Sequence, residues 1–96
     1  MNSHITADFR TCFGALPVAV QKDARDAFQQ FQQDPHYPGL QFKPVSGKLG
    51  GKKRQLWSVR IGLHYRALGE IRQDAIYWLW IGPHTEYDKI TSPTHR

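Results

Sequence analysis

The stretch LWSVRIGLHYRALGEI, Leu56 to Ile71, decides the fold, because its pattern is that of two β-strands joined by a short turn. Polar and apolar residues alternate from Leu56 to Ile61, which is the side-chain period of a strand covered on one face. Gly62-Leu63 makes the connection between them. The first strand places Trp57, Val59 and Ile61 on one face and Ser58 and Arg60 on the other, and the second strand sets Tyr65, Ala67 and Gly69 against His64, Arg66 and Leu68.

Two further strands flank this hairpin. Leu40 to Val45 is a short strand, and Pro44 predicts that it lies at a sheet edge or ends there. The run AIYWLWIG, residues 75–82, is apolar on both faces, as expected of a strand in the middle of a sheet. The following GPHTEYDKI is predicted to be a loop or a single helical turn beginning near His84. The second half is therefore an antiparallel meander of about four strands.

The first half is predicted to be helical. Thr6 caps a short helix in which Phe9 and Phe13 share one face. After Pro17 a second helix runs to about Gln33, with an apolar stripe formed by Leu16, Val20, Ala24, Phe28 and Phe31. We therefore predict a single α+β domain, residues 1–96, in which two N-terminal helices pack on one face of a small, mainly antiparallel sheet.

Composition excludes several classes of protein. The 96 residues are 40% hydrophobic, which is ordinary for a folded domain. The single cysteine, Cys12, allows no internal disulfide, and the scattered histidines have no carboxylate cluster at ligand spacing, so we expect no metal and no other cofactor. The start MNSHITADFR has no signal-peptide pattern, and no apolar run has membrane-spanning length. We expect a cytoplasmic protein without a membrane partner.

The net charge of +5 is unevenly placed. Residues 1–45 carry four basic and four acidic side chains, whereas residues 46–96 carry nine basic and four acidic ones. A one-sided positive field favours a polyanionic partner, either nucleic acid or an acidic protein segment. A solubilising surface is the alternative interpretation.

The stretch SGKLGGKKR, residues 46–54, is close to a nucleotide-binding loop but differs from one. Three residues separate Gly47 from Gly51, where the nucleotide loop has four, and a second lysine follows Lys52. A strand comes next, so no helix N-terminus meets the phosphates. We expect a mobile loop that contacts a nucleic-acid backbone through Lys48, Lys52, Lys53 and Arg54. For any single lysine, a solvated hairpin loop is the alternative.

The segments LWSVRIGLHYRALGEI and IYWLWIGPHTEYDKI, preceded by FQQDPHYPGLQFKPVSG, resemble the RelE/ParE superfamily of bacterial type II toxins. The similarity covers nearly the whole chain and is greatest to a subgroup with a C-terminal G-x-H-x-[DE]-Y-D motif, here Gly82, His84, Glu86, Tyr87 and Asp88. The resemblance implies the RelE-like fold and a toxin held inactive by a cognate antitoxin. In the RelE branch the toxin enters the ribosomal A site and inhibits translation by cutting mRNA, without a metal. In the ParE branch it inhibits DNA gyrase, and a degenerate member would only bind its antitoxin.

The resemblance also implies which residues would act in the ribonuclease branch. Arg60 and Arg66 match basic strand positions, and His84 stands where some members have a catalytic histidine and others an arginine. Tyr87 lies near the C-terminal aromatic residue of that branch. Ser58 departs from the pattern, because the members with the most basic active sites carry lysine about there, and this weakens the expectation of strong nuclease activity.

Metal-free RNA cleavage needs a base for the 2′-OH, a cation for the phosphate and an acid for the leaving oxygen. The hypothesis gives the proton transfers to His84 and the phosphate to Arg60 and Arg66. Tyr87 would stack a base or transfer a proton, and His64, on the same strand face as Arg66, is a further RNA-binding candidate.

Each assignment has a structural alternative. His84 could simply cap the terminal turn. The two arginines could pair with Glu70 or Glu86 on the surface.

Overall fold

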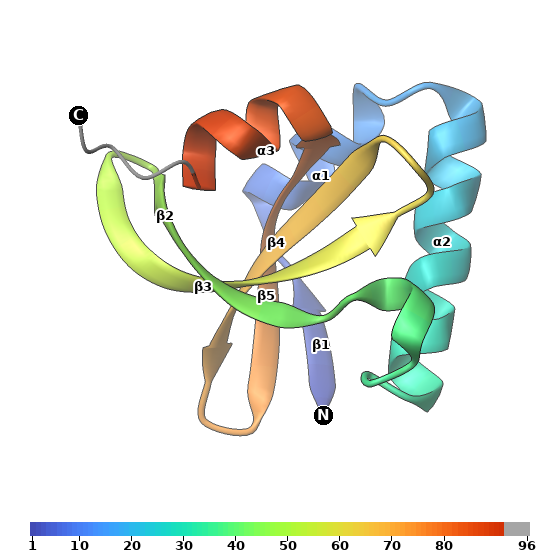
Figure 1. Cartoon of the computed structure of the whole chain (residues 1–96), viewed down its shortest axis with the longest axis horizontal. Coiled ribbons are helices and arrows are strands. Elements are labelled where there is room, and N and C mark those ends of the chain that lie inside the picture. The colour runs from blue at the N-terminus through green and yellow to red at the C-terminus, as the bar shows by residue number, and fades with distance from the viewer. Residues whose placement is uncertain (92–96) are drawn as a thin grey trace.

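The computed structural model describes residues 1–91, which fold around one five-stranded sheet (Figure 1). The strands are β1 (Asn2–Ile5), β2 (Lys43–Leu49), β3 (Lys52–Ile61), β4 (Tyr65–Arg72) and β5 (Ala75–Pro83), and the helices are α1 (Ala7–Gly14), α2 (Val18–Gln33), a 3₁₀ turn (Pro38–Leu40) and α3 (His84–Thr91). The strand order is β1-β5-β4-β3-β2. Within residues 1–91, no helix is long and apolar enough to cross a membrane.

The predicted α+β fold is confirmed, and so is the antiparallel meander from β2 to β5. One strand was missed. β1 pairs in parallel with β5 at the edge of the sheet, from Asn2 opposite Ala75 to Ile5 opposite Trp78. All four β1 residues are exposed, so the segment has no alternation that could have predicted a strand.

The prediction of a mobile glycine-lysine loop is wrong. β2 begins at Lys43 rather than Leu40 and continues to Leu49, and β3 already begins at Lys52. Only Gly50 and Gly51 are left to make the turn, with φ angles of 66° and 74°. Two consecutive left-handed residues are what a tight hairpin turn requires, and glycine adopts them without strain.

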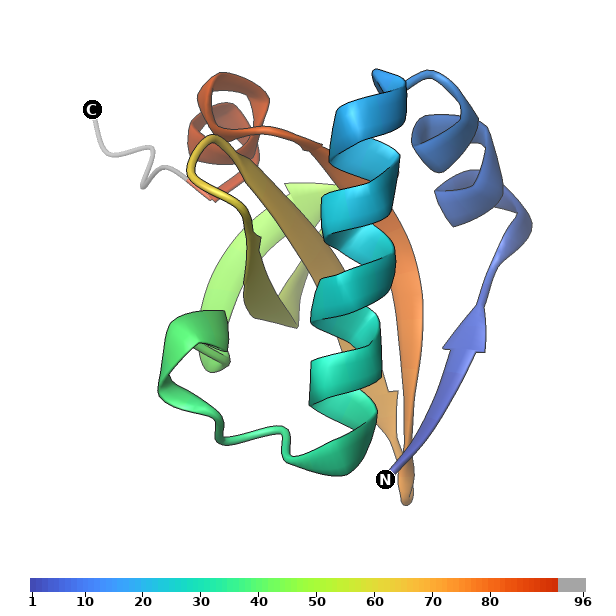
Figure 2. The ribbon, with the colours of Figure 1, turned by 90° about the vertical axis from the view of Figure 1, so that its right-hand side faces the viewer.

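Helices α1 and α2 cover one face of the sheet, as predicted (Figure 2). The predicted cap is also confirmed, since Thr6 Oγ1 accepts a hydrogen bond from the Phe9 N–H at 3.2 Å and donates one to the Trp78 carbonyl at 2.8 Å. We call the apolar cluster beneath these helices the helix-side core; its buried residues are Phe9, Leu16, Ala24, Phe31, Leu40, Val59, Ile61, Ala67, Ile76, Trp78 and Ile81.

The opposite face has a smaller core beneath α3. The prediction of a loop or single turn is wrong here, because residues 84–91 form two helical turns that pack on β2, β4 and β5. This α3-side core contains the buried residues Leu56, Leu68 and Tyr87, packed against Val45, Leu49, Leu79, Trp80 and Ile90. A β-bulge in the β4–β5 ladder makes this second core possible. Leu68 pairs with Trp80 while the next residue, Gly69, pairs with Trp78, so Leu79 is an extra residue on β5. Because of this bulge, Trp78 packs in the helix-side core and Trp80 packs against the α3-side core.

A glycine-to-alanine pair tests the packing of the helix-side core. A Cβ atom at Gly69 would lie 2.8 Å from Trp78 Cε3 and 2.9 Å from Ile76 Cγ1, whereas one at Gly14 would have no neighbour within 4 Å. We expect Gly69→Ala to lower the free energy of unfolding by about 1–3 kcal/mol through overpacking. Gly14→Ala should leave it unchanged or raise it slightly. Urea unfolding measures both, and equal stabilities of the two variants would contradict this account of the core.

Candidate functional site

Four of the predicted site residues line one open hollow beside α3. The hollow has a volume of about 520 Å³ and lies where the β3–β4 turn meets the end of β5 and the start of α3. We call it the basic hollow; its lining residues are Gln41, Arg60, Leu63, His64, Arg66, Pro83, His84 and Thr85. The arginines of the central hairpin and the histidine after the last strand therefore do meet in space.

The strand register brings these residues together. Arg60 lies directly opposite Arg66 in the β3–β4 ladder, and Arg66 lies opposite Gly82 in the β4–β5 ladder. The second ladder continues to Tyr65 opposite Pro83, and one step further the His84 N–H donates a 2.7 Å hydrogen bond to the carbonyl of His64. His64 thus belongs to the turn rather than to the strand face on which it was predicted.

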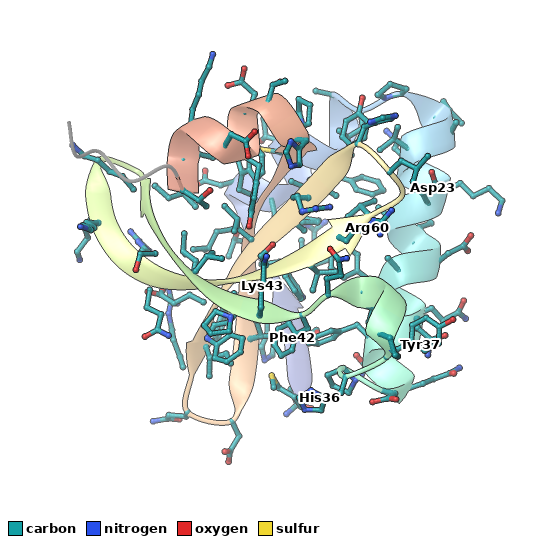
Figure 3. All side chains as sticks on the ribbon, in the orientation of Figure 1. Asp23, His36, Tyr37, Phe42, Lys43 and Arg60 are labelled. Atoms are coloured by element: carbon teal, nitrogen blue, oxygen red, sulfur yellow. The ribbon has the colours of Figure 1, made fainter. Side chains whose placement is uncertain are left out.

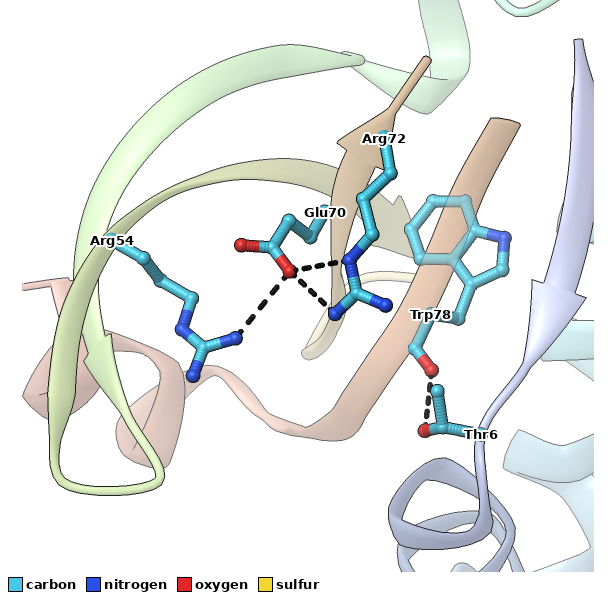
Figure 4. Close-up of polar contacts among 5 residues, drawn as sticks. All are labelled: Thr6, Arg54, Glu70, Arg72 and Trp78. Carbon is cyan, nitrogen blue, oxygen red and sulfur yellow. Dashed lines mark hydrogen bonds and ion pairs between the residues drawn. The ribbon is translucent and has the colours of Figure 1, made fainter. Parts of the chain in front are cut away.

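The two arginines keep their charge available. Arg60 Nε donates to the Gly62 carbonyl at 2.9 Å, and within residues 1–91 no carboxylate lies within ion-pairing distance of Arg60 or Arg66. The predicted alternative of pairing with Glu70 or Glu86 is wrong. Glu70 binds Arg72 at 2.7 Å and Arg54 at 3.5 Å (Figure 4), and Glu86 lies 3.6 Å from Lys89.

Two like charges directly opposite one another on neighbouring strands repel. An anion bound between Arg60 and Arg66 would relieve that repulsion and gain charge-assisted hydrogen bonds. The pair is therefore suited to a phosphate group, which presents several oxygens to two guanidinium groups.

His84 is the first residue of α3, so it does stand at the start of the terminal helix. Its side chain is 45% exposed, and its Nδ1 lies 3.2 Å from Asp88 Oδ2, one turn further along the helix. A carboxylate beside Nδ1 holds the imidazole in one orientation and leaves Nε2 for a substrate. Within residues 1–91, no group of three or more His, Cys, Asp or Glu side chains is arranged to hold a metal ion.

Tyr87 supports the site from below. It is 7% exposed and packs with Leu56 and Leu68 in the α3-side core, so stacking of a base on its ring does not fit this structure. Instead, Arg66 Cζ lies 5.7 Å from the centroid of the Tyr87 ring. An aromatic ring attracts a cation that lies over its face, so Tyr87 helps to hold the Arg66 guanidinium in position.

The four cations of the β2–β3 hairpin do not form one group. Lys48 lies opposite Lys53, while the neighbouring positions Lys52 and Arg54 point to the other face of the sheet. Arg54 is 23% exposed and paired with Glu70, so its predicted role as an RNA contact does not fit, whereas the three lysines are exposed. The hairpin turn lies at the opposite end of β3 from the basic hollow (Figure 1).

Sequence reasoning missed Lys43, an exposed cation on the same face of the sheet as Arg60. Lys43 is paired with Ser58, and Val45, two residues later on the same face, packs in the α3-side core. Lys43 therefore shares a face with Arg60 on the adjacent strand, and it is exposed (Figure 3). The sequence predicts a strand that contains Lys43, but the register of that strand against β3 depends on the position of the hairpin turn. Because the prediction makes residues 46–54 a loop, it does not place Lys43 beside Ser58.

Comparison with known proteins gives a family match. A family model described as the ParE-like toxin domain matches residues 18–89. No curated protein matches the chain significantly.

Three solved structures of similar fold are complexes of RelE-type chains with RelB-type chains. The RelBE2 toxin–antitoxin complex from Mycobacterium tuberculosis is 22% identical, with a TM-score of 0.62 over 85% of this chain and 95% of that chain. The RelE–RelB complex from Pyrococcus horikoshii OT3 is 19% identical, with a TM-score of 0.60 over 86% and 93%. The RelB–RelE complex from Methanococcus jannaschii is 17% identical, with a TM-score of 0.59 over 88% and 95%. At these identities the likeness is one of fold.

Proposed function

Because the chain belongs to the family of ParE-like toxin domains, we propose that it is the toxin of a toxin–antitoxin pair and an endoribonuclease that cuts mRNA on the ribosome. One observation carries the ribonuclease proposal: Arg60 and Arg66, without carboxylate partners in residues 1–91, face the same hollow as His64 and His84. The structures of similar fold contain RelE bound to RelB, which supports an antitoxin as the protein partner here.

In the proposed reaction the scissile phosphate lies between Arg60 and Arg66. Their opposed positions allow each guanidinium to hold a non-bridging oxygen, and both charges remain when negative charge develops on the phosphorane. Tyr87 keeps Arg66 in place through its ring. Preorganised cations of this kind stabilise the transition state more than the substrate.

The proton transfers fall to the two histidines. His84, with Asp88 beside its Nδ1, takes the proton of the 2′-OH at Nε2. The 2′-oxygen then attacks phosphorus, the bond to the 5′-oxygen breaks, and that oxygen receives a proton from His64. The products are a 2′,3′-cyclic phosphate and a 5′-hydroxyl, and no metal takes part in these steps.

Dependence on the ribosome is consistent with a hollow that holds RNA through few groups. Ser58, at 1% exposure, adds no charge, and the lysines of the β2–β3 hairpin lie at the other end of β3. The cleavage rate at such a site rises most when the ribosome holds the RNA in a fixed conformation, because the toxin then does not have to orient the RNA itself. The hairpin lysines would contact the surrounding RNA backbone.

A gyrase inhibitor is the second candidate, and the ParE-like description of the matching family model favours it. This mechanism would use protein contact rather than the hollow. It predicts growth arrest with intact mRNA and with DNA damage.

The nuclease proposal makes a direct prediction. Induced expression should arrest growth and produce cuts within translated mRNA, and Arg66→Ala should slow cleavage by about 10²–10³-fold. His84→Ala should slow it by about 10²–10⁴-fold. Mapping of 5′ ends and a growth assay measure both effects.

Matched controls are available outside the basic hollow. Arg72→Ala removes an arginine at the other end of β4, and His36→Ala removes an exposed histidine outside the hollow, so both should keep activity. Cuts that persist in Arg66→Ala, or that vanish equally in Arg72→Ala, would refute the assignment of the site.

Two substitutions of Tyr87 distinguish a role in packing from a role in proton transfer. Tyr87→Phe keeps the ring beneath Arg66 and should retain cleavage within a few-fold, because the hydroxyl is not required. Tyr87→Ala should lower the free energy of unfolding by about 3–5 kcal/mol by emptying the α3-side core. A large loss of cleavage in a stably folded Tyr87→Phe would instead give the hydroxyl a part in the chemistry.

For a lysine of the β2–β3 hairpin we expect one substitution to raise stability and to weaken ribosome binding. Lys53→Gln removes one of two like charges that face each other across the hairpin, so it should raise the free energy of unfolding by roughly 0.2–1 kcal/mol. The same change should weaken ribosome binding and reduce its logarithmic salt slope by about one. Binding measured at several salt concentrations tests this, and an unchanged slope would mean that Lys53 only faces solvent.

A further inference from the structure

Gln41 has an unusual backbone conformation at the border of the basic hollow. It follows the 3₁₀ turn and has φ 50° and ψ 43°, which is the left-handed region. Residues with a side chain seldom adopt this region, because their Cβ atom then comes too close to the backbone. The Gln41 N–H closes the turn by donating to the Pro38 carbonyl at 3.2 Å. A strained residue that lines a hollow is a candidate for a functional role.

The residues on either side of Gln41 hold its backbone in place. Leu40 is 4% exposed and belongs to the helix-side core. The centroid of the Phe42 ring lies 4.9 Å from that of Trp57 and 5.0 Å from that of Phe31. Gln41 itself is exposed. Its backbone is therefore anchored on both sides, while its side chain is free to contact a ligand.

The strand register places Gln41 in line with the two arginines. Lys43 pairs with Ser58 in the β2–β3 ladder, and two residues beyond this pair stand Gln41 on one segment and Arg60 on the other. Arg60 in turn lies opposite Arg66. Gln41 and both arginines line the basic hollow. A nucleotide whose phosphate lies between the arginines therefore extends its ribose and base toward Gln41 at the end of this row.

The chemistry of Gln41 suits a base rather than a phosphate. Its side-chain amide carries a donor and an acceptor side by side, whereas the arginines and histidines of the hollow bind anions or transfer protons. Glutamine makes a pair of hydrogen bonds with adenine, to the amino group and to a ring nitrogen. Leu63 also lines the hollow and is 72% exposed, so it offers an apolar surface to the face of the same base.

We propose that Gln41 determines the base preference of cleavage by binding the edge of an adenine next to the scissile phosphate; the proposal rests on the proposed ribonuclease function. Gln41 Oε1 accepts a hydrogen bond from the adenine amino group, and Nε2 donates one to a ring nitrogen. The adenine face lies against Leu63. Arg60 and Arg66 hold the phosphate, which is the same in every nucleotide and carries no sequence information.

The base preference of cleavage in a cell-free translation reaction tests this. The purified chain is added, and the 5′ ends of the cut mRNA are mapped. For the wild type we expect adenine to be favoured at one position next to the cut. Gln41→Gly removes the amide and suits the left-handed backbone, so the chain should fold as before. The preference for adenine over the other bases should fall by about tenfold or more. Total cleavage should fall by no more than about threefold.

A second variant keeps the size of the side chain. Gln41→Glu replaces the amide by a carboxylate, which accepts hydrogen bonds but cannot donate one to the adenine ring nitrogen. It should lose the preference for adenine to a similar extent. Its total cleavage should fall further than in Gln41→Gly, because a negative charge in the hollow repels the phosphate.

Gln73 provides a matched control. It is also an exposed glutamine in the left-handed region, with φ 57°, but it lies in the turn between β4 and β5, at the end of β4 away from the basic hollow. Gln73→Gly makes the same chemical change in the same backbone conformation, and it should keep the adenine preference of the wild type. Urea unfolding should show no loss of stability in either glycine variant.

Three results would overturn the proposal. These are wild-type cuts without a preference for adenine next to them, an unchanged preference in Gln41→Gly, and an equal loss of preference in Gln73→Gly. Absence of mRNA cuts by the wild type would reject the proposed function and this inference with it. Abundant cuts with an unaltered base distribution in Gln41→Gly would reject only this inference.

Discussion

The antiparallel register of β3 and β4 is the constraint on which the rest of the molecule depends. Val59 opposite Ala67, and Ile61 two residues later, have no exposed surface in the helix-side core. A slip of one residue would turn these side chains to the other face, so core packing fixes the register strongly. Because Arg60 and Arg66 alternate with them, the same packing sets two positive charges opposite each other on the far side of the sheet. The apolar core thus maintains an electrostatic arrangement that would not form by itself.

On the α3 side of the sheet, the same few residues fill the small core and line or support the basic hollow. Tyr87 fills the α3-side core with its ring and supports Arg66 from below, while His84, three residues earlier on α3, borders the hollow. The backbone hydrogen bond from His84 to His64 joins the start of this helix to the β3–β4 turn. The position of α3 therefore places His84 at the hollow, and α3 is itself held by the small core around Leu56 and Leu68.

Local patterns were enough for the parts of the fold in which neighbours in sequence pack together. The Leu56–Ile71 hairpin and the α2 stripe follow directly from their periodicity. β1 was not predictable in this way, since its parallel pairing with β5 joins residues more than 70 positions apart and all of its side chains are exposed. At Gly50 and Gly51 the sequence predicts a long loop where the structure has a two-residue turn between two strands. Glycine is common both in loops and in tight turns, so composition alone could not distinguish the two.

The candidate site was predictable in its members but not in its geometry. Arg60, Arg66 and His84 were selected through the family resemblance, and their convergence follows only from two strand registers taken together. The burial of Tyr87 and the pairing of Arg54 with Glu70 arise from tertiary contacts that no local pattern contains.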